Sequence, residues 1–316
     1  MKKFTLIGLL MMVIFGKGFS SDLLTDKVKF ASVEKASELL TQEDNFTKSW
    51  SQFDIDSRMH KKGSTREELF DFITKQTREW TSEEQNKITA ILKNIDKQVD
   101  KQGFKIDYPD EIYLVKTTAN EEGGAEGYTR ANYIILKENI LSKSKADLTK
   151  LIVHELFHVL SRNNPEFRNE MYQIIGFRMM NEVEYPESLK AYRITNPDAP
   201  QLDSYIRIKV GGQSKDCMMI LYSNQEYDGG DFFSYLNVGF LSLTGDSEKT
   251  IEYQNDKPVI FSFEEVTGFF EQVGKNTQYI IHPEEICAEN FAFAILNKPG
   301  LPNPEIVSEI KEKLKE

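Results

Sequence analysis

A long apolar segment near the middle of the chain carries two histidines and a glutamate. Apolar residues recur at three- and four-residue spacing over about residues 145–162, which predicts a helix. Its central part, residues 151–160, reads LIVHELFHVL. A helix this apolar is expected to be buried, and buried polar side chains need partners. The fold must therefore surround His154, Glu155 and His158 with polar groups or with an ion.

The spacing of these three residues favours a metal site. His154 and His158 are four positions apart, so both imidazoles lie on one helix face and can bind one ion. Glu155 lies about 100° around the helix, where a carboxylate can take a proton from a metal-bound water. Zn²⁺ is the predicted cofactor, because neutral imidazole is a good zinc ligand. The alternative is that the three side chains satisfy one another's hydrogen bonds in a helical core.

A catalytic zinc normally takes a third protein ligand and one water, and the segment 282–293 offers that ligand. Pro283 suits the first position of a helix, which would place Glu285 and Glu289 one turn apart on one face. Glu285 is predicted to bind the metal, and Glu289 to accept the free ring N–H of a ligating histidine. His282 is the alternative third ligand.

These segments resemble the gluzincin branch of the zincin metallopeptidases, whose signature is HExxH followed by a later helical glutamate. The resemblance implies zinc held by His154, His158 and Glu285, with Glu155 as general base and Glu289 as the carboxylate behind the ligands. This chain has Glu289 where the thermolysin-like pattern has aspartate, and 127 positions separate His158 from Glu285. The third histidine of the metzincin branch is absent.

The expected fold class is α+β, with a zincin-like metallopeptidase domain. Four parts are predicted: a signal peptide at 1–20, a helical N-terminal region at 21–108, the catalytic domain at 109–300 and a C-terminal tail at 301–316. Within the catalytic domain, strands at 112–118 and 128–136 are predicted to pair as a hairpin, and a helix at 166–180 follows the metal helix. A strand-rich insertion separates the two metal-binding helices, with strands at 205–210, 217–222 and 232–243.

The start of the chain and its charge indicate where the protein acts. Lys2 and Lys3 precede an apolar run at 4–15, the layout of a secretory signal, so export is expected, to the periplasm or medium if the source is bacterial. The run is short for a bilayer span, and no stable membrane association is expected after its removal. The net charge of −11, from 50 acidic and 39 basic residues, argues against a nucleic-acid partner.

The predicted function is therefore that of an exported zinc metallopeptidase. It would hydrolyse peptide bonds in a peptide or protein substrate through a zinc-bound water activated by Glu155. Two alternatives stay open: a zinc amidase or esterase that does not act on peptides, and an exported binding protein whose metal site is inactive or structural.

Several other residues are weaker candidates. Donors to the oxyanion are sought among Tyr172, Tyr222, Tyr227 and His282. By the same resemblance, residues 128–134 are a candidate sheet edge that aligns the substrate. The remaining candidates are favoured as ordinary structure. Thr195–Pro200 is favoured as a connector, although it could line the cleft, and the turn with Glu226, Asp228 and Asp231 is favoured as a polar turn over a calcium site. Cys217 and Cys287 are favoured as separate buried thiols over a disulfide, and His60 as a solvated residue.

Overall fold

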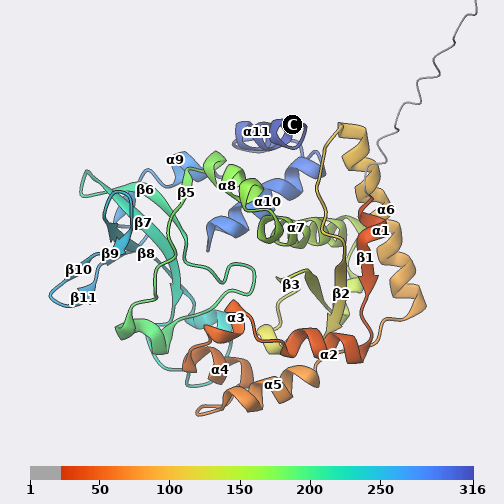
Figure 1. Ribbon diagram of the computed structural model, residues 1–316, viewed down its shortest axis with the longest axis horizontal. Helices are drawn as coiled ribbons and strands as arrows, with labels where there is room; N and C mark the ends of the chain where they lie inside the picture. The colour runs from red at the N-terminus through yellow and green to blue at the C-terminus, as the bar shows by residue number, and fades with distance from the viewer. Residues whose placement is uncertain (1–22) are drawn as a thin grey trace, which may run out of the picture.

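The computed structural model describes residues 23–316 and has an α+β fold (Figure 1). The predicted signal peptide lies outside the described residues. The helices are α1 (Leu24–Lys27), α2 (Val33–Thr41), α3 (Asn45–Lys48), α4 (Gln52–Met59), α5 (Arg66–Thr74), α6 (Ser82–Gln102), α7 (Lys145–Asn163), α8 (Pro165–Ile174), α9 (Phe270–Val273), α10 (Pro283–Ile295) and α11 (Pro304–Lys313). The strands are β1 (Val28–Phe30), β2 (Ile112–Thr117), β3 (Gly127–Arg130), β4 (Tyr133–Lys137), β5 (Phe177–Met179), β6 (Ser204–Val210), β7 (Gln213–Tyr222), β8 (Asn237–Thr244), β9 (Thr250–Ile251), β10 (Tyr253–Gln254), β11 (Lys257–Pro258), β12 (Ile260–Phe261) and β13 (Val266–Thr267).

The first sheet has four strands in the order β1-β2-β4-β3. Side chains alternate between its faces, as a pleated strand requires. Leu114 and Ile134 belong to the main core, which includes α6, α7 and α10. Val115 and Ile135 face the other way and pack in a second core with α2 and α5. Helices therefore cover both faces of this sheet (Figure 1).

The predicted hairpin between 112–118 and 128–136 is wrong. β2 pairs in parallel with β4, and β3 pairs antiparallel with β4 on its far side. The segment 128–136 is not one strand, because a two-residue turn at Ala131 and Asn132 folds it back on itself, with Ala131 at a φ of 42°. As a consequence, β3 is one of the two edge strands of the sheet. Of the predicted edge 128–134, only residues 128–130 lie on it, because residues 133 and 134 belong to the interior strand β4.

The second sheet is the predicted strand-rich insertion. Seven strands belong to it: β12, β8, β7, β6 and β13 in that order, with β5 paired to β6 and β9 paired to β8. Ile206 and Phe240 on one face join the main core. Met218 and Leu241 on the other face pack under the segment 183–202. The predicted strands at 205–210 and 217–222 are present, and the third begins at Asn237 because residues 232–235 form a 3₁₀ turn.

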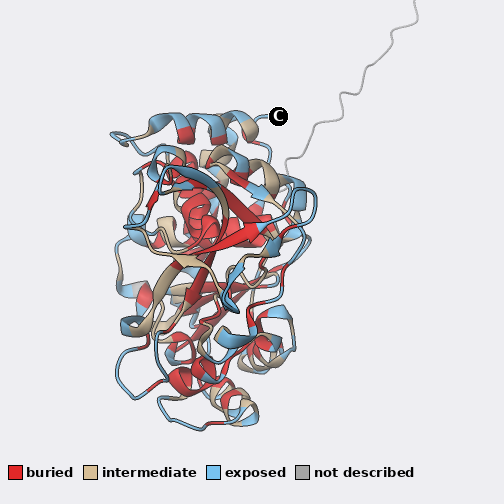
Figure 2. Ribbon diagram, turned by 90° about the vertical axis from the view of Figure 1, so that its left-hand side faces the viewer, coloured by how far each residue is buried: buried red, intermediate tan, exposed pale blue. Residues whose placement is uncertain are grey.

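The main core lies between the two sheets and is built around α7 and α10. Every residue of α10 except Glu289 is buried, and α7 is buried along most of its length from Leu148 to Ser161. Buried positions run continuously through the middle of the molecule in Figure 2, while the outer helix faces are exposed. Within the part of the chain that is described, no helix has the length and apolar character that a membrane crossing requires.

The N-terminal region and the tail pack onto the rest of the structure. β1 extends the first sheet by pairing in parallel with β2, and Ile306, Val307 and Ile310 of α11 are buried in the main core. The helix predicted at 166–180 is shorter than expected. It ends at Ile174, and Gly176 adopts a φ of 80° before β5 begins.

Candidate metal centre

α7 presents His154, Glu155 and His158 from the buried part of the helix. Ser144 caps its first turn by accepting a hydrogen bond from the Asp147 N–H. The helix then runs without interruption to Asn163, so the two histidines lie one turn apart. Their ring centroids are 4.9 Å apart.

α10 presents three glutamates toward α7. Pro283 occupies the first helical position, as predicted, and His282 caps the helix with its side chain accepting from the Glu284 N–H at 3.2 Å. Burial lowers the pKa of His282 to about 4, so its ring is neutral and suited to accept this bond. His282 is thus a cap and does not join the two histidines of α7, so the alternative third ligand is not supported by the geometry.

His154, His158 and Glu285 converge. The Nε2 atom of His154 lies 3.1 Å from Glu285 Oε2, and the Nε2 atom of His158 lies 3.5 Å from the same oxygen. One ligand atom from each of the three residues lies within 4.8 Å of the others. The Nε2 atom of His158 is buried and has no hydrogen-bond partner. Two imidazoles and one carboxylate in this arrangement fit the donor set of a zinc site.

The opposite nitrogen of each imidazole is held by a second glutamate. His154 Nδ1 lies 3.3 Å from Glu289 Oε1, and His158 Nδ1 lies 3.2 Å from Glu284 Oε1. An acceptor at Nδ1 fixes the tautomer that leaves the Nε2 lone pair free for a metal. Glu289 therefore has the place predicted for it. Glu284 was missed, although its position directly before Glu285 on a predicted helix was a usable signal.

The charges around the centre favour a cation. Burial lowers the pKa of His154, but hydrogen bonds to Glu285 and Glu289 outweigh it and raise that pKa to about 9. Burial would raise the pKa of Glu285, but the charge of His158 and the hydrogen bond to His154 hold it well below its usual range. Carboxylates thus surround the two rings, an environment that stabilises positive charge between them.

Glu155 lies beside this group, under the edge strand β3. It is 3% exposed, and Thr129 Oγ1 donates a hydrogen bond to its Oε2 at 2.8 Å. Its Oε1 faces the backbone of Gly127, where an added Cβ would come within 2.9 Å. Burial raises the pKa of Glu155. A carboxylate that is oriented and partly desolvated in this way is suited to exchange protons.

The segment Thr195–Pro200 also reaches the centre, so its interpretation as a plain connector is wrong. Asn196 Nδ2 donates to Glu285 Oε1 at 2.7 Å, and Asp198 Oδ1 accepts from the Thr129 N–H at 2.6 Å. Carboxylate and ring atoms of Glu155, His158 and Asp198 lie within 4.8 Å of one another. The less favoured alternative, that this segment lines the cleft, agrees with the place of Asp198 in the cavity wall.

A cavity of about 540 Å³ opens onto the centre. Among its lining residues are His154, Glu155, Asp198 and Glu285, together with Tyr279, whose ring centroid lies 6.1 Å from that of His154. Tyr279 is 43% exposed as a whole, but desolvation within the site and the charges of Glu285 and Asp198 hold the pKa of its hydroxyl well above the usual range, so it stays protonated. Tyr279 was not among the predicted oxyanion donors.

The four predicted oxyanion donors lie away from the cavity that opens onto the centre. Tyr172 donates to Glu284 Oε2 at 2.7 Å inside the core, and Tyr227 donates to the Gly230 carbonyl. Tyr222 lies on β7 in the second sheet, and His282 caps α10. None of these four lines the cavity beside His154.

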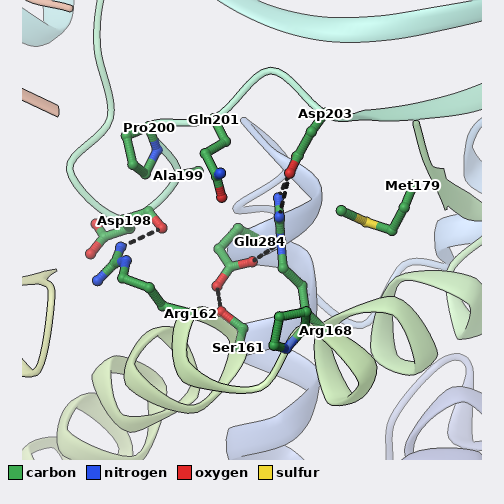
Figure 3. A pocket seen from close by; sticks show the side chains of 11 residues that line it. Ser161, Arg162, Arg168, Met179, Asp198, Ala199, Pro200, Gln201, Asp203 and Glu284 are labelled. Atoms are coloured by element: carbon green, nitrogen blue, oxygen red, sulfur yellow. Dashed lines mark hydrogen bonds and ion pairs between the residues drawn. The ribbon is translucent and has the colours of Figure 1, made fainter. Parts of the chain in front are cut away.

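A second, smaller cavity of about 180 Å³ lies behind the centre (Figure 3). In it, Arg162 donates to the Pro197 and Asp198 carbonyls at 3.0 and 3.1 Å, so α7 holds the loop in place. Ser161 donates to Glu284, and Arg168 pairs with Asp203 at 2.7 Å. These bonds fix Glu284 and the loop from the side opposite the open cavity.

The remaining candidates behave as ordinary structure. Cys217 and Cys287 are buried free thiols, as predicted. His60 is exposed and ends α4 in a left-handed conformation. Within residues 23–316, the potential metal clusters all lie at the centre, and the turn with Glu226 and Asp228 forms none.

The chain matches no protein-family model, no curated protein and no solved structure. Its function must therefore be inferred from the geometry of its own residues.

Proposed function

We propose that this protein is a zinc-dependent metallopeptidase that hydrolyses peptide bonds at the centre between α7 and α10. The observation that carries the proposal is that the Nε2 atoms of His154 and His158 both lie close to Glu285 Oε2, at 3.1 and 3.5 Å. The Nδ1 atom of each ring lies beside a separate glutamate. Helical histidines four apart and a distant helical glutamate support a zincin-like identity for this part of the chain.

His154, His158 and Glu285 would hold the metal, and Glu284 and Glu289 would orient the two rings. When bound, a zinc ion supplies Lewis acidity to a carbonyl oxygen and lowers the pKa of a coordinated water. The unpartnered Nε2 of His158 supports this assignment, because a buried polar atom without a partner is costly.

Glu155 would move the proton. Its Oε2 is held by Thr129 Oγ1, which leaves Oε1 directed toward Gly127 and the cavity. We assign Oε1 to take a proton from the attacking water and to deliver it to the nitrogen that leaves. The raised pKa of Glu155 supports the second step, because a carboxyl that binds a proton firmly in a buried site can hold it until the amine departs.

Tyr279 and Gly127 would orient the substrate. Tyr279 stands beside His154 with a protonated hydroxyl, the form that can donate to an oxygen that gains negative charge. Gly127 lets the edge strand β3 lie against Glu155, so an extended peptide that pairs with this edge would lie close to Glu155. The peptide partner and the export of the chain are part of the proposal, and the N-terminal residue of the exported protein tests the predicted signal cleavage near residue 20.

The Glu155→Gln variant tests the function. Glutamine has the same shape and can still accept from Thr129 Oγ1, but it cannot take a proton. We expect it to bind zinc as the wild type does and to lose at least about 100-fold in kcat on unfolded protein substrates, in line with general-base catalysis. Full turnover by this variant would overturn the role of Glu155. Cleavage of small amides or esters without any cleavage of peptides would favour the alternative hydrolase.

A further inference from the structure

The edge of β3 is open for only a short distance beside the centre. The Lys137 N–H donates to the Glu126 carbonyl across the β3–β4 pair. In an antiparallel pair, every second residue of a strand points its N–H and C=O groups away from the partner strand. Gly127 and Thr129 therefore direct these groups away from β4, toward the open edge. The Thr129 N–H is already occupied by Asp198 Oδ1 at 2.6 Å. An extended peptide can therefore pair at Gly127, but it cannot continue along the edge past Thr129.

The loop that closes this edge is held firmly in place. Arg162 binds the carbonyls of Pro197 and Asp198, and it also donates to the Ala131 carbonyl in the β3–β4 turn at 3.2 Å. Asn196 is tied to Glu285 at 2.7 Å. Figure 3 shows Arg162 reaching from α7 to the backbone of the loop at Asp198. The loop at Asn196–Asp198, which blocks the edge of β3 at Thr129, is the closed end of the cleft. Its hydrogen bonds connect it to α7 and α10, and Arg162 also connects to the first sheet.

The closed end carries the carboxyl group of Asp198 very near the reacting atoms. Burial raises the pKa of this group, and the charge of His158 lowers it. Asp198 lines the same cavity as His154, Glu155 and Glu285, and a carboxylate oxygen of Asp198 lies within 4.8 Å of ligand atoms of Glu155 and His158. A carboxylate at this place repels a substrate carboxylate and attracts an ammonium group, and an ammonium group beside the acid favours its ionised form.

The distance selects which ammonium group fits. In a peptide, the α-amino nitrogen of a residue is two bonds from its carbonyl carbon, about 2.5 Å away by standard bond lengths. The cationic end of a lysine or arginine side chain lies several bonds farther from that carbon. A carboxylate that is this close to the general base is therefore placed for the α-ammonium of the residue whose carbonyl is attacked.

Building on the proposed peptidase function, we infer that the cleft takes peptides by their free N-terminus, with Asp198 binding the α-ammonium, so that the enzyme is an aminopeptidase. In each turnover the water oxygen forms a bond to the carbonyl carbon of the first residue, and the C–N bond to the second residue breaks. Glu155 transfers the proton taken from the water to the departing amine nitrogen.

A side pocket beside Asp198 indicates which first residue fits. This pocket, of about 80 Å³, shares Gly127 and Tyr279 with the larger cavity. Its walls are mostly apolar, with contributions from Ile194, Leu221, Phe232, Leu236 and Ile281. Thr195 also lines it, and its buried Oγ1 has no hydrogen-bond partner. Leucine is therefore the first residue chosen for the test.

The test compares leucyl-leucine amide with its N-acetylated form on the zinc-loaded full chain. We expect kcat/KM to be at least 100-fold higher for the free amine. The Asp198→Asn variant keeps the acceptor for the Thr129 N–H and removes the carboxylate, so it should lower kcat/KM much more for the free amine than for the acetylated peptide and reduce that preference at least tenfold. In the Glu155→Gln background, calorimetry should show weaker binding of the free amine, but not of the acetylated peptide, when Asp198→Asn is added.

Three results would overturn the inference, and they point to different causes. Equal cleavage of free and acetylated peptides would leave the peptidase function standing and remove the aminopeptidase assignment. An equal loss on both peptides in Asp198→Asn would show that Asp198 has only a structural role. Failure to cleave any peptide would remove the proposed function together with this inference.

Discussion

His158 shows at the scale of one side chain why the centre is suited to a metal. The residue is fully buried, and its Nδ1 is satisfied by Glu284, while its Nε2 has no hydrogen-bond partner. A buried polar atom without a partner costs about 1–3 kcal/mol. A cation between His158, His154 and Glu285 would remove that cost.

Glu284 and Glu289 are proposed to orient the two histidines through their Nδ1 atoms. Glu289 offers the clearer single-residue test of this role, because it is the least buried of the α10 glutamates. In Glu289→Gln, the His154 ring keeps a neighbour of the same shape but loses a charged acceptor. We expect zinc affinity to fall about 10- to 100-fold, the usual effect of such partners. Competition with a chelator measures this. Glu271→Gln on α9, at an exposed position, is the matched control, and equal affinity in both variants would contradict the assignment.

The residues that could be predicted from the sequence share a local pattern. His154, Glu155 and His158 lie within one helical turn, and Glu285 and Glu289 lie one turn apart. The other residues reach the centre only through the fold. The segments that carry Thr129 and Asp198 could be proposed from the sequence as a sheet edge and a cleft-lining loop, but not the contacts that these two residues make. Tyr279 was missed, because it comes from an irregular segment that no periodicity relates to α7.

At the scale of elements, the closeness of β3 to α7 depends on Gly127. A Cβ at this position would lie 2.9 Å from Glu155 Oε1, and the neighbouring Cγ and Cδ atoms are both within 3.3 Å. Gly127 is not at a positive φ, so alanine strains only this contact.

Gly127→Ala should therefore displace Glu155 and leave the fold intact. A shift of about 1 Å in a catalytic group can cost about 100-fold in rate, and we expect a loss of that order in kcat with little change in the melting temperature. Steady-state kinetics and thermal unfolding of the same sample measure the two effects. Unchanged kcat would show that the contact between β3 and Glu155 is not tight in solution.

The start of α10 contains a pH-dependent cap. The neutral ring of His282 accepts from the Glu284 N–H, and burial lowers its pKa from about 6.5 to about 4. In the unfolded chain this ring takes up a proton near pH 6.5, while in the folded chain it does so only near pH 4. Its contribution to stability is therefore complete above pH 6.5 and is lost as the pH falls to 4.

The His282→Asn variant isolates this effect, because asparagine also caps helices but does not titrate. Between pH 7 and pH 4, the wild type should lose about 3 kcal/mol more of its unfolding free energy than the variant, at roughly 1.4 kcal/mol per pH unit. Denaturant unfolding of both chelated proteins measures this difference. Parallel pH profiles would show that the His282 cap does not titrate as its burial requires.

Helices could be predicted better than strand pairing for a physical reason. Asn164 caps α8 and Pro165 and Pro283 begin helices as expected, because capping depends on neighbours in the sequence. The parallel pairing of β2 with β4 depends on the connection between them, which passes through a 3₁₀ turn at Asn120–Glu122 and carries β3 to the far edge. Such a crossing leaves no periodic signal in either strand.

At the scale of the whole molecule, the N-terminal region helps to shape the centre. Asp54 of α4 accepts from the Thr195 N–H at 3.0 Å, at the start of the loop that carries Asp198. Arg58 pairs with Asp54 and with Glu122 at 2.7 Å, which links α4 to the connection before β3. The N-terminal region and the connection before β3 thus help to fix the loop that carries Asp198.

The zinc content of the purified full chain tests most directly whether His154, His158 and Glu285 form one metal site. We predict one zinc ion per wild-type chain, and less than a tenth of that in His154→Ala, His158→Ala and Glu285→Ala. His60→Ala, which removes an exposed histidine, should retain the full amount. Circular dichroism checks that each variant is folded. Wild-type protein that binds no zinc, or a folded Glu285→Ala variant that binds it as tightly as the wild type, would contradict the assignment.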